Sequence, residues 1–169
     1  MPVDVKFHLA EVNVARLKAP LESPLLTGFV SRLDEINALA DHSEGFVWRL
    51  QTPEGNATYL RVFDDDMIIV NLSVWTSVES LKRYVYRSAH AELLRDRRTW
   101  FEHFSGAFLA MWWVPAGHRP GIDEATLTPG NVRLIRVSDG QQVEANINTT
   151  GGGDAIILQP VRLLDAETQ

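Results

Sequence analysis

Alternating and helical patterns of apolar residues divide the first 120 residues of the chain into six elements. Alternation of apolar with other residues predicts four strands, at 5–17, 46–51, 67–75 and 107–115. Apolar residues at a spacing of three and four predict two helices, one from Ser23 to Gly45 and one from Ser77 to about His103. Both begin at a serine, a residue preferred at helix starts. The predicted order is βαββαβ.

This order is that of a ferredoxin-like fold, an α+β architecture in which two helices cover one face of an antiparallel sheet. The opposite face then needs a cover of its own. In the strand 67–75, Ile68 begins one face, and Asn71, Ser73 and Trp75 share the other. An uncovered face that carries Trp and Ile side chains predicts a homodimer, in which two sheets close as a dimeric α/β barrel.

The pattern changes near residue 120, so we expect one domain over 1–120 and a β-rich C-terminal extension over 121–169. Strand-like runs at 131–137, 142–147 and 155–164 alternate with turn residues. They indicate a small meander. The pattern is compatible with a meander that lies against the main domain, extends an edge of its sheet or crosses to another subunit.

The amino-acid composition excludes several kinds of chemistry and several kinds of partner. The chain has 169 residues, 45% of them hydrophobic and 22% charged, and contains no cysteine. This excludes thiol nucleophiles, zinc–thiolate sites, iron–sulfur clusters and disulfides. A net charge of -6 speaks against nucleic acid as a partner. The sequence has no apolar run long enough for a membrane span and no secretory leader at its start, so we expect no membrane partner and a cytoplasmic location.

Five segments together resemble a bacterial family known as DUF3291, a domain of unknown function. They are LAEVNVARLKAPL (9–21), INALADHSEGFVWRLQ (36–51), FDDDMIIVNLSVWTSVESL (63–81), YRSAHAELLRDRRTWF (86–101) and WWVPAGHRP (112–120). The resemblance covers residues 5 to about 120 and implies the dimeric α/β-barrel superfamily, near the antibiotic-biosynthesis monooxygenases. Members of that superfamily oxidise aromatic polyketides without a cofactor, bind or degrade haem, isomerise lactones or have no known chemistry, so the fold alone selects none of these.

The second predicted helix carries one candidate catalytic group. Tyr86, His90 and Arg97 are spaced by four and seven residues, which places all three within an arc of about 40° on an uninterrupted helix. His90 could act as a general base, Tyr86 as a proton donor and Arg97 as the partner of an anion. The same pattern also fits a structural role, with polar-tipped side chains at the edge of the buried helix face and Arg97 in a surface ion pair.

A second candidate site is the sheet face expected to lie opposite the helices. Alternation assigns Asn71, Ser73 and Trp75 to it, with Asn13 and Arg49 as further candidates. Polar groups among aromatic side chains would orient a ligand in a cavity between two sheets, although water or a dimer contact would satisfy them equally well. Adjacent tryptophans point to opposite faces of a strand, and we assign Trp113 to the cavity and Trp112 to the core.

Metal and cofactor signals are weak. The five histidines show no metal-binding spacing, and no dinucleotide, P-loop or serine-hydrolase motif is present, so no metal and no cofactor are expected. Haem, with His90 or His103 as axial ligand, is a minor alternative. The leading interpretation is a homodimeric protein that binds an aromatic metabolite and performs cofactor-independent oxidation or proton transfer. The alternative is a noncatalytic binding or assembly module whose β tail recruits a partner.

Overall fold

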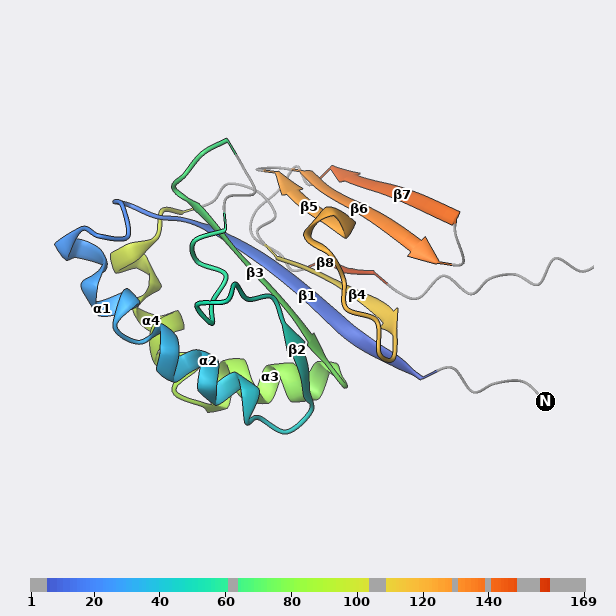
Figure 1. Cartoon of the computed structure of the whole chain (residues 1–169), viewed down its shortest axis with the longest axis horizontal. Coiled ribbons are helices and arrows are strands. Elements are labelled where there is room, and N and C mark those ends of the chain that lie inside the picture. The colour runs from blue at the N-terminus through green and yellow to red at the C-terminus, as the bar shows by residue number, and fades with distance from the viewer. Residues whose placement is uncertain are drawn as a thin grey trace, which may run out of the picture.

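The computed structural model describes residues 6–60, 64–103, 109–128, 131–138, 141–148 and 156–158. Its main unit is built from the following elements: β1 (Phe7–Arg16), a 3₁₀ turn η1 (Pro24–Leu26), α1 (Thr27–Val30), α2 (Leu33–Asp41), β2 (Phe46–Arg49), β3 (Ile68–Trp75), α3 (Val78–Arg87), α4 (His90–Trp100) and β4 (Leu109–Pro115). The predicted order βαββαβ and the α+β ferredoxin-like class are confirmed, with each helical segment in two or more pieces (Figure 1).

The main sheet has the strand order β2-β3-β1-β4-β8, in which β8 is the strand Ile156–Leu158. β1 lies at the centre and is antiparallel to β3 on one side and to β4 on the other. β2 pairs with β3 through a bulge between Phe46 and Trp48. The four antiparallel strands form the ferredoxin-like arrangement, in which strands that are distant in sequence become neighbours.

The first helical segment begins as predicted and then breaks. The Ser23 side chain accepts a hydrogen bond from Leu25 N, and Pro24 occupies the first turn. Instead of one helix, the chain forms η1, α1 and α2, because the N–H of Arg32 bonds to the carbonyl of Phe29, three residues back. The segment ends before Gly45, whose φ of +82° and close approach to Ser80 exclude a side chain, since an added Cβ would lie 2.2 Å from Ser80 Oγ.

The second helical segment also breaks, which makes the prediction of one helix from Ser77 to His103 wrong. Ser77 caps α3 as expected by accepting a hydrogen bond from Ser80 N at 3.1 Å. At Ser88 the backbone is extended, with φ -121° and ψ -178°. The Ser88 hydroxyl donates to the carbonyl of Tyr84 and accepts from the N–H of His90. A serine that bonds locally to the backbone in this way ends one helix and starts the next.

One face of the main sheet is apolar throughout, and we call it the apolar face. It consists of Ala10, Val12, Val14, Ile68, Val70, Leu72, Val74, Ala110, Trp112 and Val114. These side chains are only 0% to 7% exposed within a single chain. Val47, Trp48, Leu50 and Ile122 pack against them. As the βαββαβ order predicts, the helices do not pack on this face, and other described side chains of the same chain pack on it instead.

The helices cover the opposite face. There Leu9, Trp75 and Met111 form one apolar cluster with Ala40 of α2 and Leu81 of α3. A second cluster joins Leu17 and Ile69 to side chains of α1, α2 and α4. The prediction that Asn71, Ser73 and Trp75 share a face is consistent with this arrangement, but that face lies under the helices rather than opposite them. Alternation groups residues by face without indicating which face the helices cover.

The segment after β4 is β-rich, as predicted. It contains η2 (Ile122–Glu124), β5 (Ala125–Thr128), β6 (Asn131–Ser138), β7 (Gln141–Asn148) and β8. β5, β6 and β7 form a separate antiparallel meander, whereas β8 pairs in parallel with β4 at the edge of the main sheet. In Figure 1 the meander and the helices lie on opposite sides of β1. The predicted strand 155–164 is described only at Ile156–Leu158, and its other residues lie outside the described part of the chain. The division at residue 120 stays a prediction.

Candidate functional site

Polar side chains cross the middle of the helix-covered face, between its two apolar clusters. Glu11 and Asn13 on β1 lie directly opposite Ser73 and Asn71 on β3, and Arg49 on β2 lies opposite Ser73. Residues opposite one another in antiparallel strands project to the same face. We call Glu11, Asn13, Arg49, Asn71 and Ser73 the polar belt.

Hydrogen bonds within the polar belt converge on Glu11. Asn13 Nδ2 donates to Glu11 Oε1 at 2.6 Å, and Ser73 Oγ donates to Glu11 Oε2 at 3.0 Å. Trp75 Nε1 donates to Ser73 Oγ at 2.9 Å. An indole N–H can only donate, so this bond leaves the Ser73 hydroxyl proton for Glu11. Both carboxylate oxygens thus accept hydrogen bonds from neutral groups.

Glu11 is a buried carboxyl group that titrates near neutral pH. It is 6% exposed, and burial raises its pKa from 4.5 to about 7, although the hydrogen bonds from Asn13 and Ser73 act in the opposite direction. Among the described residues no Lys, Arg or His forms an ion pair with it. A carboxyl group with this pKa can both accept and release a proton under physiological conditions.

One residue of the polar belt, Asn71, is exposed to solvent. It lies in the central part of β3 between Val70 and Leu72, which are both buried. It belongs to the helix-covered face, so the helices leave this position open. Asn71 Nδ2 lies 3.5 Å from Asn13 Oδ1 and extends the donor series toward Glu11. A small molecule that enters at Asn71 would therefore meet the hydrogen bonds that lead to Glu11.

Arg49 closes one end of the polar belt. Its Nε and Nη2 atoms donate to the two carboxylate oxygens of Asp41 at 2.7 Å and 3.1 Å, and Nη1 donates to the carbonyl of Gly55 at 2.7 Å. Its side chain is 12% exposed. The fork of hydrogen bonds fixes the guanidinium group, joining β2, the end of α2 and the loop after β2. Arg49 thus places a fixed positive charge beside the site.

An aromatic stack borders the site. The rings of Trp75 and Tyr84 are stacked at 5.1 Å, and the ring of His90 lies 4.9 Å from that of Tyr84. The Tyr84 hydroxyl donates to the carbonyl of Ile36 at 3.2 Å. Burial raises the pKa of Tyr84, and the negative charge of Glu11 raises it further. Tyr84 is therefore a neutral packing residue whose ring lies close enough to Glu11 to feel its charge.

The three candidates on the second helical segment do not form the expected group. Tyr86 is on α3 and is 64% exposed, whereas His90 and Arg97 are on α4, beyond the break at Ser88. His90 packs against Tyr84, and burial lowers its pKa. Arg97 bonds to the carbonyl of Leu94 in its own helix. Within the described residues no hydrogen bond joins these three side chains, and their catalytic roles stay predictions.

Most of the other residues predicted to bind a ligand lie in or beside the polar belt. Asn13, Arg49, Asn71 and Ser73 come together in the polar belt, and Trp75 bonds to it through Ser73. Trp113 lies on the helix-covered face and packs beside the cluster around Trp75, while Trp112 lies on the apolar face. The two tryptophans lie on opposite faces, as alternation requires, but Trp113 faces the helices rather than a cavity opposite them.

Sequence interpretation missed Glu11, the centre of the site. The signal was present, because Glu11 interrupts the apolar strand FHLAEVNVAR and has the same parity as Asn13. It also missed Tyr84, which has the helical spacing of an ordinary core residue. A charged residue inside a buried strand is the pattern that would have identified Glu11.

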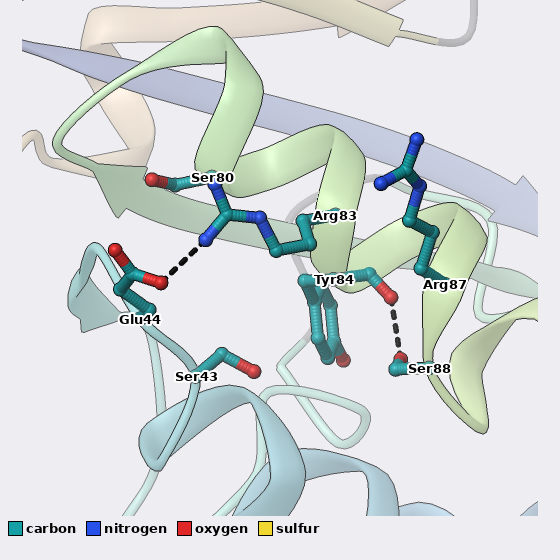
Figure 2. A pocket seen from close by; sticks show the side chains of 7 residues that line it. All are labelled: Ser43, Glu44, Ser80, Arg83, Tyr84, Arg87 and Ser88. Carbon is teal, nitrogen blue, oxygen red and sulfur yellow. Dashed lines mark hydrogen bonds and ion pairs between the residues drawn. The ribbon is translucent and has the colours of Figure 1, made fainter.

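A shallow pocket of about 140 Å³ lies beside Tyr84. It is lined by Ser43, Glu44, Ser80, Arg83, Tyr84, Arg87 and Ser88 (Figure 2). Most of its polar groups already have partners: Arg83 pairs with Glu44, Ser43 donates to the carbonyl of Leu39, and Ser88 bonds to Tyr84. The side chain of Arg87 points away from Ser88 in Figure 2. Most polar groups that line this pocket are therefore already paired with other groups of the protein.

The described residues contain neither a cluster of metal-ligating side chains nor a membrane-spanning helix. No group of three or more histidine, aspartate or glutamate side chains is placed to hold a metal ion. His103 is exposed just after α4, and His90 is packed against Tyr84. No described helix has the length and apolar character needed to cross a membrane.

The fold and the polar belt define an α+β protein with a ferredoxin-like sheet and a buried carboxyl group beneath its helices. The chain belongs to the DUF3291 family, a domain of unknown function, whose family model matches residues 8–137. Among curated proteins none matches the sequence.

Solved structures resemble the chain only distantly. SnoaB, a cofactor-independent oxygenase from Streptomyces nogalater, is 20% identical with a TM-score of 0.42, over 69% of this chain and 98% of that one. NE2512, a protein of unknown function from Nitrosomonas europaea, is 12% identical with a TM-score of 0.43, over 69% and 97%. PA3566 from Pseudomonas aeruginosa is 12% identical with a TM-score of 0.39, over 68% and 97%. These values are too low to carry an argument about function.

Proposed function

We propose that the protein binds a small organic molecule above the polar belt and that Glu11 accepts a proton from it. The observation that carries the proposal is Glu11 itself, a buried carboxyl group with a pKa of about 7 that hydrogen bonds through Asn13 connect to the exposed Asn71. General bases work best when their pKa lies near the operating pH. Glu11 therefore takes the role for which His90 was the sequence candidate.

The hydrogen bonds around Glu11 define what a ligand must offer. Asn13 and Ser73 each donate to one of its two oxygens, which leaves a further lone pair on each oxygen for a ligand. A ligand that donates an O–H or N–H group to a remaining lone pair completes the site. When the proton passes to Glu11, the ligand becomes the anion and accepts a hydrogen bond from the newly formed carboxyl O–H.

The surroundings favour such an ionisation. Arg49 places a positive charge at the end of the polar belt, partly balanced by Asp41. The exposed Asn71 amide can bond to a ligand oxygen. Because Glu11 is buried, its own polar contacts are stronger than in water. An acidic hydroxyl compound, such as a phenol, is the ligand class that fits.

The finer proposal is that the ligand is an aromatic metabolite and that its anion reacts further. Trp113, Trp75 and Tyr84 border the site and provide flat apolar surface. An electron-rich anion can be oxidised by dioxygen without help from a cofactor, and proton transfer would be the first step of that reaction. The simpler outcome is reversible proton transfer with no oxidation.

Titration with p-nitrophenol tests the proposal, because the ionised form of this phenol absorbs visible light. At a pH near 7, where a substantial part of Glu11 is ionised, adding wild-type protein is expected to increase the absorbance of the anion. Glu11→Gln should abolish this increase. Glu22→Gln, at an exposed position outside the site, is the matched control and should behave as wild type.

Two results would overturn the proposal: no binding of the probe by wild-type protein, or an equal absorbance change with Glu11→Gln. Oxygen consumption in the same samples separates oxidation from simple proton transfer. The alternative of a noncatalytic assembly module would gain support if none of these phenol signals appeared.

A further inference from the structure

One face of α3 is polar although it borders another part of the chain. Residues three and four apart on a helix share a face. On and just after α3, such a series lines the pocket beside Tyr84 with polar or polar-tipped side chains: Ser80, Arg83, Tyr84, Arg87 and Ser88. The turn between α2 and β2 adds Ser43 and Glu44 (Figure 2). A helix face that borders protein is usually apolar, so this polar series indicates a site for a ligand rather than for packing.

The side chains that line the pocket carry more positive than negative charge. Arg83 and Arg87 lie one helical turn apart, and Glu44 is the acidic residue among those that line the pocket. Arg83 Nη1 donates to Glu44 Oε2, in an ion pair whose side chains are 50% and 82% exposed. Ion pairs this exposed contribute little to stability, and this one uses a single N–H group of the five that a guanidinium group has. Arg83 therefore has donors left for a ligand.

Arg87 adds a second guanidinium group. Within the described part of the chain, no ion pair includes Arg87. In Figure 2 no dashed line joins it to another residue of the pocket, whereas one joins Arg83 to Glu44. The Arg87 side chain is exposed, so its guanidinium group can turn toward a ligand in the pocket. Together the two arginines provide donors on one side of the pocket.

A buried hydroxyl group also lines the pocket. Ser80 is 8% exposed, and its Oγ lies 3.1 Å from Ser77 Oγ and 3.4 Å from Thr76 Oγ1. Ser77 Oγ accepts a hydrogen bond from Ser80 N, and the Ser77 hydroxyl can itself donate to Ser80 Oγ. The Ser80 proton is then available to a ligand. The hydroxyls of Ser43 and Ser88, in contrast, donate to backbone carbonyls.

We propose that this pocket binds a phosphate group, either of the free ion or of a small phosphorylated molecule. Near neutral pH a phosphate carries more than one negative charge and presents oxygen atoms in several directions, so it can accept hydrogen bonds from both guanidinium groups and from Ser80. A carboxylate has one charge and two oxygen atoms, a role that Glu44 already fills at Arg83. None of the pocket residues belongs to the polar belt, so this inference is independent of any chemistry at Glu11.

Titration of the full chain with inorganic phosphate, followed by NMR at constant pH and ionic strength, is the first test. The backbone amide signals of Ser43, Ser80 and Arg87 are expected to shift and to reach saturation. Acetate should bind about tenfold more weakly, because it accepts fewer charge-assisted hydrogen bonds. Phenyl phosphate separates the two sources: equal affinity identifies the free ion as sufficient, and tighter binding identifies a phosphorylated molecule.

Three variants test the roles of the charges. Arg87→Gln should weaken phosphate binding about tenfold, since it removes charge-assisted hydrogen bonds. Glu44→Gln should strengthen the binding, because it removes a negative charge and releases Arg83. Lys82→Gln is the matched control: it removes one positive charge from an exposed position of the same helix outside the pocket, and it should change the affinity no more than about twofold.

Three results would contradict the inference: no saturable shift in the wild-type protein, equal affinity for acetate and phosphate, or equal weakening by Lys82→Gln and Arg87→Gln. The last would show a diffuse attraction of anions to the helix surface. Urea denaturation checks that each variant is folded. If Arg87→Gln does not fold, Glu44→Gln decides the question, and weaker or unchanged phosphate binding in that variant argues against the site.

Discussion

The two faces of the main sheet are built from the same strands but have opposite character. On the apolar face, every residue contributed by β1, β3 and β4 to the core cluster is apolar and almost fully buried. On the helix-covered face, apolar clusters occupy the two ends, and Glu11, Asn13, Asn71 and Ser73 separate them. The same backbone therefore supports one uniform core and one interrupted core.

The polar residues between the two apolar clusters lower the stability of the fold. An apolar side chain at position 11 would bury surface favourably, whereas a carboxyl group must lose water on folding and keeps only neutral hydrogen-bond partners. Folds retain such groups most often where chemistry requires them. The comparison indicates that the apolar face holds the fold together, and it supports the proposal that the polar belt carries the function. Four predictions test this division.

Leu72→Ala should have the largest effect on stability. Leu72 lies on the apolar face and is 2% exposed, so the substitution removes buried methyl groups and leaves a cavity. We expect a loss of about 2–5 kcal/mol in the free energy of unfolding. Urea denaturation measures it. A loss below about 1 kcal/mol would mean that the apolar face is less tightly packed than the structure indicates.

Glu11→Gln should change how stability depends on pH. The folded-state pKa of Glu11 is raised from 4.5 to about 7, so between these values the folded protein binds more protons than the unfolded chain. The stabilisation from this proton is complete below about pH 4.5 and is lost as pH rises through about 7. The loss amounts to about 3 kcal/mol.

Urea denaturation at a series of pH values from 4.5 to 8 measures this effect. Wild-type stability should fall over the interval, and Glu11→Gln should lack that part of the slope. The slope is the readout rather than the absolute stability, because the Gln amide faces donors from Asn13 and Ser73. Equal slopes in both proteins would show that Glu11 does not titrate as a buried group.

The sequence predicted the architecture because local signals agreed with it. Strand alternation, the cap residues Ser23 and Ser77 and the turn at Gly45 all act over a few residues. Parity also placed Asn71, Ser73 and Trp75 on a common face. The side on which the helices pack depends on tertiary structure, and parity contains no information about it.

The errors at the candidate site have two physical sources. The break at Ser88 arises from hydrogen bonds of one serine hydroxyl to Tyr84 and His90, which compete with an otherwise regular helical pattern. Glu11 becomes functionally interesting only because the helices bury it, and burial is a property of the assembled fold. Its sequence signal was a single charged residue in a strand.

Ser73→Ala should have an intermediate effect on stability and should also change the pKa of Glu11. The substitution removes a hydrogen bond that lowers the pKa of Glu11 and leaves Trp75 Nε1 without its acceptor. We expect the pKa of Glu11 to rise above its wild-type value and stability to fall by about 1–3 kcal/mol. Carboxyl NMR titration and urea denaturation measure the two effects. Ser43→Ala, which removes a hydroxyl bonded to Leu39, should leave the Glu11 pKa unchanged.

Asn71→Ala should have the smallest effect on stability and a measurable effect on binding. Asn71 adjoins Leu72 but is exposed on the other face, so its replacement should alter stability by no more than about 0.5 kcal/mol. If the ligand enters at Asn71, loss of one hydrogen bond of about 1 kcal/mol should weaken p-nitrophenol binding about fivefold. Unchanged affinity would place the ligand elsewhere, while a large loss of stability would make the polar belt part of the structural core. The division of the sheet into a structural and a functional face requires both results together: weaker p-nitrophenol binding and unchanged stability of Asn71→Ala.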